Sequence, residues 1–250
     1  MLKAERCSAI LDLVEAKGFV TVGEFMQVLN VSDMTIRRDL TELEAQGKLR
    51  RVHGGAQSLN SYKQRELSHE EKKVIHTPEK EAVVKKALTL IEDGDTIFLG
   101  PGTTIELLAQ QLEARELRII TNSLSVFLIL QQKTNLQKVY LIGGELRQKT
   151  GAFYGEIANS ALQKFSYAKA FVSANAIKGN QVMNASIEEG KTQNVALENS
   201  QERYLLIDDS KINKEDFFTF YLLEDLTAVI TNQGKFHVEK ELEQYVKVIV

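Results

Sequence analysis

Residues 31–43 have the sequence Val-Ser-Asp-Met-Thr-Ile-Arg-Arg-Asp-Leu-Thr-Glu-Leu. The apolar residues of this stretch stand at the spacing of one stripe along a helix: Ile36, Leu40 and Leu43. Ser32 precedes the helix, where its hydroxyl can accept a hydrogen bond from a free N–H of the first turn. Arg38 points away from the apolar stripe. The stretch therefore predicts a helix that is buried on one side and polar near its start.

The polar side of this predicted helix carries Thr35, Arg37 and Arg38. Such a side suits the major groove of DNA, because arginine binds guanine edges through two hydrogen bonds and phosphates can sit at a helix start. The alternative is an ordinary amphipathic helix, since charged runs are usually just solvated. The flanking sequence favours the DNA-reading interpretation.

The flanking residues predict the rest of a small DNA-binding domain. Residues 2–14 have a helical apolar period, and Thr21 followed by Glu24 is a capping box that opens a second helix. Only a short turn separates that helix from Ser32, which is the helix-turn-helix arrangement. A strand at 48–52 and a loop signal after it then predict a wing. The basic residues of the wing would contact phosphates: Arg50, Arg51 and His53.

Composition limits the class of protein. The 250 residues are 43% hydrophobic and 26% charged, as in globular proteins, and the net charge of −3 means that any DNA-binding surface is local. One cysteine, Cys7, excludes an internal disulfide and a cysteine-rich metal site. No signal peptide or membrane span is apparent, so we expect a cytoplasmic protein without membrane contact, cofactor or metal.

The remaining chain predicts a linker and a larger domain. Residues 58–76 are polar and predict a linker, partly helical, in which His69 and His76 are solvated. From residue 77 onward, short apolar runs alternate with helical periods, which predicts a mostly parallel sheet covered on both faces. The predicted strands lie at 96–99, 118–121, 139–142, 170–172, 204–207, 228–231 and 246–250. The expected architecture is thus an α+β winged helix-turn-helix domain (1–57), a linker (58–76) and an α/β domain (77–250).

Polar residues follow three of these strands, at the edge where parallel sheets bind ligands. They are Gly100-Pro101-Gly102-Thr103-Thr104, Thr121-Asn122-Ser123 and Asp208-Asp209-Ser210-Lys211. Two glycines before a helix start suit an anion, although Thr103 and Glu106 could instead form a simple capping box. Glycine, hydroxyl and amide residues without an aromatic cage predict a phosphorylated polyol or sugar, with Lys211 at the phosphate.

Two further pairs of charged residues each allow a functional and a structural interpretation. Glu188 and Glu189 could be catalytic carboxylates, but Glu189 stands three residues after Ser186, and a helix cap is favoured. Arg147 and Lys149 either close over a ligand or lie in a solvated loop.

The motifs resemble those of a known family. Residues 31–44, with Gly47 and Val52-His53-Gly54-Gly55-Ala56, look like the amino-terminal domain of DeoR-type bacterial transcriptional repressors. The later motifs look like the sensor domain of that family: Gly100–Thr104, Thr121–Ser123, Gly143–Arg147, Lys169–Asn175 and Asp208–Lys211. The resemblance implies a winged helix-turn-helix and a sensor domain similar in fold to ribose-5-phosphate isomerase that binds phosphorylated sugars. It also implies a homo-oligomer.

The same resemblance assigns site residues. Those presented to double-stranded operator DNA would be Ser32, Thr35, Arg37 and Arg38, and the wing would add Arg50, Arg51 and His53. The effector-binding residues would be Gly100, Gly102, Thr103, Thr104, Thr121, Asn122, Ser123 and Lys211.

One subgroup resembles this chain most. The Phe-Leu-Gly-Pro-Gly-Thr-Thr form at 98–104 is similar to that of the lactose phosphotransferase system repressors of Gram-positive bacteria, which implies tagatose 6-phosphate as inducer. Where the family often has aspartate, this chain has Gly100, which weakens the case for catalysis. We therefore expect a repressor of a lactose or galactose catabolic operon, released from DNA by a sugar phosphate. The alternative is a sugar-phosphate isomerase with an appended DNA-binding domain, which needs a general base in the pocket.

Overall fold

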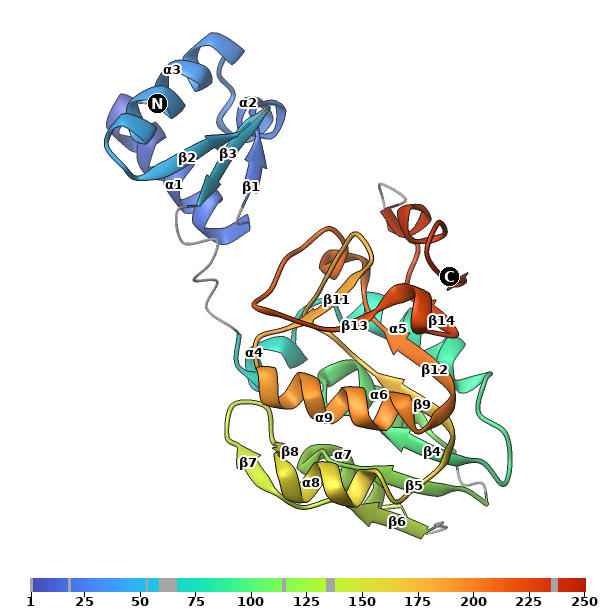
Figure 1. The fold of residues 1–250 in the computed structure, drawn as a ribbon. Helices are drawn as coiled ribbons and strands as arrows, with labels where there is room; N and C mark the ends of the chain where they lie inside the picture. Colours follow the sequence, from blue (N-terminus) through green and yellow to red (C-terminus); the bar gives the residue numbers. More distant parts are fainter. Residues whose placement is uncertain are drawn as a thin grey trace. The chain divides into compact units, whose positions relative to one another are not determined.

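The chain folds into two units, residues 1–65 and 66–250 (Figure 1). The structure is a computed structural model, and it describes residues 2–17, 19–52, 54–58, 67–113, 116–133, 138–234 and 238–250.

The first unit is a winged helix-turn-helix. Its elements are α1 (Lys3–Lys17), β1 (Phe19–Thr21), α2 (Val22–Leu29), α3 (Asp33–Ala45), β2 (Leu49–Val52) and β3 (Gly55–Ser58). The strands form an antiparallel sheet in the order β1-β3-β2. Thr21 and Glu24 form the predicted capping box of α2, and Ser32 caps α3. The strand β1 was not predicted, because three residues before a helix carry too little periodicity to be recognised.

The three helices of this unit share one core, and α3 has its apolar stripe in that core. The predicted residues Ile36, Leu40 and Leu43 are at most 2% exposed. Asp39 lies on the same buried side, where its carboxylate accepts a 2.5 Å hydrogen bond from Arg6 Nε of α1. This partly buried ion pair joins α1 to α3, so the orientation of α3 depends on a charged contact as well as on apolar packing.

The second unit contains the predicted parallel sheet, with seven strands in the order β15-β14-β12-β9-β4-β5-β6. Their bounds are β4 (Thr96–Leu99), β5 (Arg118–Thr121), β6 (Lys138–Leu141), β9 (Tyr167–Val172), β12 (Ser200–Leu206), β14 (Ala228–Ile230) and β15 (Val248–Ile249). All pairings between these strands are parallel. The fold predicted from the sequence is confirmed.

Helices cover both faces of the sheet (Figure 1). They are α5 (Thr77–Leu88), α6 (Thr103–Gln111), α7 (Leu124–Gln131), α8 (Glu156–Leu162) and α9 (Ile187–Glu198). Because side chains alternate along a strand, Ile97 and Leu99 pack with α5 and α6, whereas Phe98 packs on the face that carries α8 and α9. The continuous apolar runs in the sequence reflect this burial on two sides.

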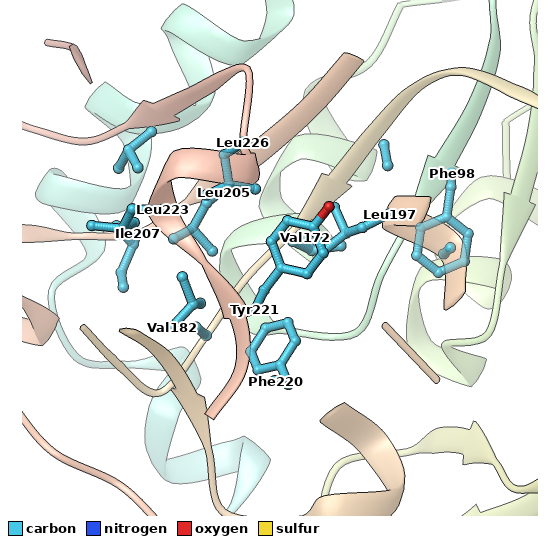
Figure 2. Close-up of a cluster of buried hydrophobic side chains, with 14 of the residues drawn as sticks. Phe98, Val172, Val182, Leu197, Leu205, Ile207, Phe220, Tyr221, Leu223 and Leu226 are labelled. Carbon is cyan, nitrogen blue, oxygen red and sulfur yellow. The ribbon is translucent and has the colours of Figure 1, made fainter. Parts of the chain in front are cut away.

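In the described part of the second unit, five antiparallel strands were not predicted. A hairpin is formed by β7 (Glu145–Arg147) and β8 (Ala152–Tyr154), and a small sheet by β10 (Ala176–Lys178), β11 (Gln181–Asn184) and β13 (Phe218–Leu222). Figure 2 shows Val182, Phe220 and Tyr221 of this small sheet beside Leu205 and Val172 of the large one. These strands are short, and β13 pairs with a strand far from it in the sequence, so local patterns do not reveal them.

The other short elements are α4 (His69–Lys73) and three 3-10 turns, η2 (Asp209–Lys211), η3 (Leu223–Asp225) and η4 (Val238–Leu242). The helix α4 lies inside the segment predicted as a partly helical linker. Among the described helices, none is long and apolar enough to cross a bilayer.

Candidate functional site

The exposed face of α3 is built by its cap and its first turns. Ser32 Oγ accepts from Thr35 N at 3.4 Å, and the two hydroxyls lie 2.9 Å apart, so Ser32 and Thr35 stand together at the helix start. Met34 beside them is 81% exposed. The structure therefore brings the predicted contact residues of the helix to one solvent-facing surface.

The arginines of this unit differ in their partners. Arg37 Nε donates to Asp33 Oδ1 at 2.6 Å, and an Arg51 guanidinium nitrogen donates to Thr41 Oγ1 at 2.6 Å. Arg51 thereby joins the wing to α3. Arg38 and Arg50 are exposed, and within the described part of the chain neither forms an ion pair. Both arginines thus point to solvent, while His53 lies outside the described residues.

A cleft of about 730 Å³, including its mouth, opens at the carboxyl edge of the parallel sheet. Its wall is formed where β4, β9 and β12 end, and these three strands are neighbours in the sheet. Residues of α4, α5 and α9 complete the wall. The lining consists of His69, Lys72, Ile75, His76, Lys80, Pro101, Gly102, Thr103, Thr104, Thr150, Ser173, Ala174, Asn175, Asn184, Glu189, Gln193, Ile207, Asp208 and Lys211.

The start of α6 faces this cleft without a side-chain cap. Gly102 is the residue before the helix, its φ is +137°, and a Cβ there would lie 3.2 Å from Ser173 Cβ. The positive φ favours glycine at this position, and Ser173 leaves little room for a side chain. The alternative capping box is not formed, because Glu106 binds His69 instead of the helix start. The free N–H groups of the first turn remain available to an anion.

Three lysines line the cleft, namely Lys72, Lys80 and Lys211, and the charges of Lys80 and Lys211 interact. Lys80 of α5 is 5% exposed, and its Nζ donates to the carbonyl oxygen of Lys72 at 2.5 Å. Burial lowers the pKa of Lys80, and the charge of Lys211 lowers it further, while Asp208 acts in the opposite direction. Neither lysine forms an ion pair with a carboxylate in the described segments. Two ammonium groups thus share one partly desolvated site.

Lys80 and His69 were not recognised as site residues from the sequence. Lys80 stands in a helix where lysine is normally exposed, and His69 was predicted to be solvated. That prediction for His69 is wrong: its side chain is 13% exposed, and its Nε2 lies 2.5 Å from Glu106 Oε1. His76 is exposed at the cleft, as predicted for a solvated residue. The burial of Lys80 and His69 depends on the packing of α4, and no local signal reveals it.

The opposite wall carries hydrogen-bonding groups. Gln193 of α9 is 2% exposed, and its Oε1 is buried without a partner. Asn175, after β9, accepts from Lys72 Nζ at 2.9 Å and donates to Asp216 at 2.8 Å. Amide groups that face a polar cleft can bind the hydroxyl groups of a ligand.

Glu189, one of the two carboxylates that the sequence offered as catalytic candidates, has a structural role. Glu189 N donates to Ser186 Oγ at 3.3 Å, which is the predicted helix cap. The carboxylate of Glu189 accepts from Arg147 at 3.0 Å and from the Thr150 hydroxyl. Arg147 therefore ties the β7–β8 hairpin to α9.

Four of the eight predicted effector residues line the cleft: Gly102, Thr103, Thr104 and Lys211. The group Thr121, Asn122 and Ser123 does not, because β5 lies on the far side of β4 from β9. These three residues are fully buried; Asn122 Nδ2 donates to the Phe153 carbonyl at 2.8 Å, and Ser123 caps α7. Gly100 packs against Val172. Conversely, the end of β9, which no prediction included as a contact, supplies Ser173, Ala174 and Asn175 to the lining.

Comparison with known proteins accounts for both units. A model of the DeoR-like helix-turn-helix domain matches residues 6–62, and a model of the DeoR C terminal sensor domain matches residues 75–233. The chain belongs to the DeoR family. Within the described residues of this DeoR family member, no group of three or more His, Cys, Asp or Glu could hold a metal ion.

Full-length relatives of this DeoR family member narrow the group. It is 49% identical to the lactose phosphotransferase system repressor of Streptococcus mutans serotype c and 47% identical to that of Staphylococcus aureus, over all of each chain. Among solved structures, ribose 5-phosphate isomerase A from Methanocaldococcus jannaschii matches with a TM-score of 0.40 and 20% identity over 53% of each chain. The chain is thus a homologue of lactose phosphotransferase system repressors. Because these homologues are repressors and not enzymes, the isomerase alternative is not retained.

Proposed function

We propose that this chain represses a lactose or galactose catabolic operon, and that a sugar phosphate, tagatose 6-phosphate, releases it from double-stranded operator DNA. The names of its full-length relatives support the repressor role. The observation that carries the effector assignment is the pair of lysines at the uncapped start of α6.

Phosphate fits this pair of lysines for an electrostatic reason. Burial lowers the pKa of Lys80, because the ammonium group is partly removed from water, and the nearby charge of Lys211 acts in the same direction while Asp208 opposes it. A phosphate dianion would neutralise both charges and accept hydrogen bonds from the N–H groups of Thr103 and Thr104. We assign Lys80, Gly102, Thr103, Thr104 and Lys211 to the phosphate.

The sugar part would then extend toward the amide-bearing wall. Gln193 Oε1 is a buried acceptor without a partner, and Asn175 lines the same cleft. Leaving such an acceptor unsatisfied costs about 1–3 kcal/mol, so a ligand hydroxyl that donates to it would gain affinity. This arrangement favours a polyhydroxylated ligand over inorganic phosphate.

Operator recognition would follow from the exposed side of α3 and from the wing. We propose that Ser32, Thr35 and Arg38 read or position the DNA and that Arg50 contacts phosphates. A homo-oligomer would present two such units to half-sites one helical turn apart, or a multiple of that distance.

Thermal unfolding of the full chain against a panel of sugar phosphates tests the effector assignment. A ligand that binds only the folded state stabilises it by about 2.7 kcal/mol at a concentration of 100 Kd. We expect the midpoint to rise with tagatose 6-phosphate and not with tagatose. A rise with another sugar phosphate alone would assign the repressor to a different catabolic pathway. No rise with any of them would refute the effector site.

A further inference from the structure

The helix α4 is a weakly packed part of the cleft wall. It is five residues long, and none of its residues is buried. By contrast, α6 and α9 each bury at least five residues. An element with few buried apolar contacts opens at low free-energy cost, so a ligand can readily order α4.

Polar contacts hold α4 in place, and they involve the wall of the cleft. Lys72 Nζ donates to Asn175 Oδ1 at 2.9 Å, and Lys80 Nζ donates to the Lys72 carbonyl at 2.5 Å. At the start of the helix, His69 contacts Glu106 at 2.5 Å, and Lys73 Nζ lies 3.5 Å from the other oxygen of Glu106. Of these residues, His69, Lys72, Lys80 and Asn175 line the cleft itself.

The helix α4 stands close in sequence to the boundary between the two units. The second unit begins at residue 66, and α4 begins at His69. A change in the order of α4 therefore occurs directly next to the connection with the DNA-binding unit.

We propose that α4 senses occupancy of the effector site: a bound sugar phosphate ties α4 to the cleft wall and so alters the segment that leads to the DNA-binding unit. This inference rests on the proposed effector site. An ammonium group has three N–H donors, so Lys80 can keep its bond to the Lys72 carbonyl and still bind a phosphate. Because Lys80 Nζ holds the carbonyl of Lys72 in α4, a phosphate that fixes Lys80 also fixes this contact between α4 and the wall without breaking it.

Hydrogen exchange of the full chain, with and without saturating tagatose 6-phosphate, tests this inference. We expect the backbone amides of residues 69–74 to exchange at least fivefold more slowly with ligand, while those of the distant helix α8 stay unchanged. In Lys72→Met, which keeps the length of the side chain, the ligand should still raise the unfolding midpoint, but the added protection of α4 should fall below twofold. Lys85→Met, on the exposed side of α5, is the matched control and should behave as the unmodified chain.

The outcomes separate this inference from the proposed function. A rise in the unfolding midpoint with unchanged exchange of α4 would overturn the sensing role and leave the effector site standing. Full protection of α4 in Lys72→Met would also overturn it. No rise in the midpoint with any sugar phosphate would overturn both.

Discussion

Lys80 and Lys211 show how single residues can mark a ligand site. Both line the same cleft, and burial lowers the pKa of Lys80, with the charge of Asp208 opposing this effect and that of Lys211 adding to it. Such an arrangement stabilises nothing by itself, because burial of like charges is unfavourable. Perturbed titratable groups of this kind are concentrated at functional sites, which is the reason for placing the phosphate between them.

Replacing Lys211 by alanine should remove one of these charges. A hydrogen bond to a charged group contributes about 1.5–3 kcal/mol, so we expect at least about a tenfold loss of affinity for tagatose 6-phosphate, with operator binding retained. Isothermal titration of the full chain measures this. Lys214→Ala, three residues away and exposed, should keep the original affinity. An unchanged affinity in Lys211→Ala would move the phosphate site elsewhere.

In the DNA-binding unit, Arg38 is the residue whose predicted role can be tested in the same way as that of Lys211. It is exposed near the middle of α3, whereas Arg37 is engaged with Asp33. Arg38→Ala should weaken specific operator binding by about 1–3 kcal/mol if its guanidinium reads a base. An electrophoretic mobility shift with operator and with scrambled DNA measures the specific part, and the unfolding midpoint should not change. Equal losses on both DNAs would instead assign Arg38 to phosphates.

At the scale of elements, the wing depends on a close backbone approach. A Cβ on Gly55 would lie 2.2 Å from the carbonyl oxygen of Val20, so β3 can pair with β1 only if this position is glycine. The sequence motif around residues 52–56 thus has a packing reason in addition to any contact with DNA.

Gly55→Ala should separate β3 from β1 and destabilise the first unit by about 1–3 kcal/mol, as overpacking does. Gly23→Ala is the matched control, because a Cβ there has its nearest neighbour at 3.9 Å, and alanine favours a helix over glycine by about 1 kcal/mol. Urea denaturation followed by circular dichroism should therefore show opposite shifts. Unchanged stability in Gly55→Ala would contradict the predicted clash.

The docking of α4 should depend on pH through Glu106. Burial alone would raise the pKa of Glu106, but the contacts with His69, Ser125 and Lys73 together outweigh it, and the pKa is lowered. A carboxyl group whose pKa is lowered by folding contributes stability above its unfolded pKa, about 4.3, and loses it as the pH falls through the folded value. Protection of the α4 amides should thus persist at neutral pH and be lost progressively as the pH falls below the unfolded pKa of about 4.3 and through the lower folded one. Glu106→Gln should show weak protection at every pH, and an identical profile in both chains would contradict this role.

At the scale of the whole molecule, the function requires coupling between two units of one chain. The DNA-binding surface lies in residues 1–65 and the cleft in residues 66–250. An effector can release DNA only if its affinity differs between the DNA-bound and free states. Such coupling is reciprocal and typically amounts to about 1–3 kcal/mol.

We therefore expect tagatose 6-phosphate to weaken operator binding about 5–150-fold and the operator to weaken binding of the sugar phosphate by the same factor. Fluorescence anisotropy with labelled operator, and titration of the ligand with and without that DNA, measure the two factors. Equal affinities in all four conditions would refute release by this sugar phosphate, while leaving its binding intact.

The local signals in the sequence were sufficient for most elements. The capping residues Thr21 and Ser32, the stripe on α3 and the buried strands all follow from short-range patterns, and the structure contains each of them. Such features depend on neighbours within a few residues, so a single sequence records them. The family motifs also predicted the types of the two domains, a helix-turn-helix domain and a sensor domain, and the family comparisons confirm both.

Only the tertiary structure decided which strand ends form the cleft. The order β12-β9-β4-β5 places the end of β9 between those of β12 and β4 and leaves Thr121, Asn122 and Ser123 outside the lining. It likewise packed α4 against the cleft, where Lys80 is buried and His69 is partly buried. Strand order and helix docking result from side-chain packing between distant segments, and no local pattern encodes which segments become neighbours.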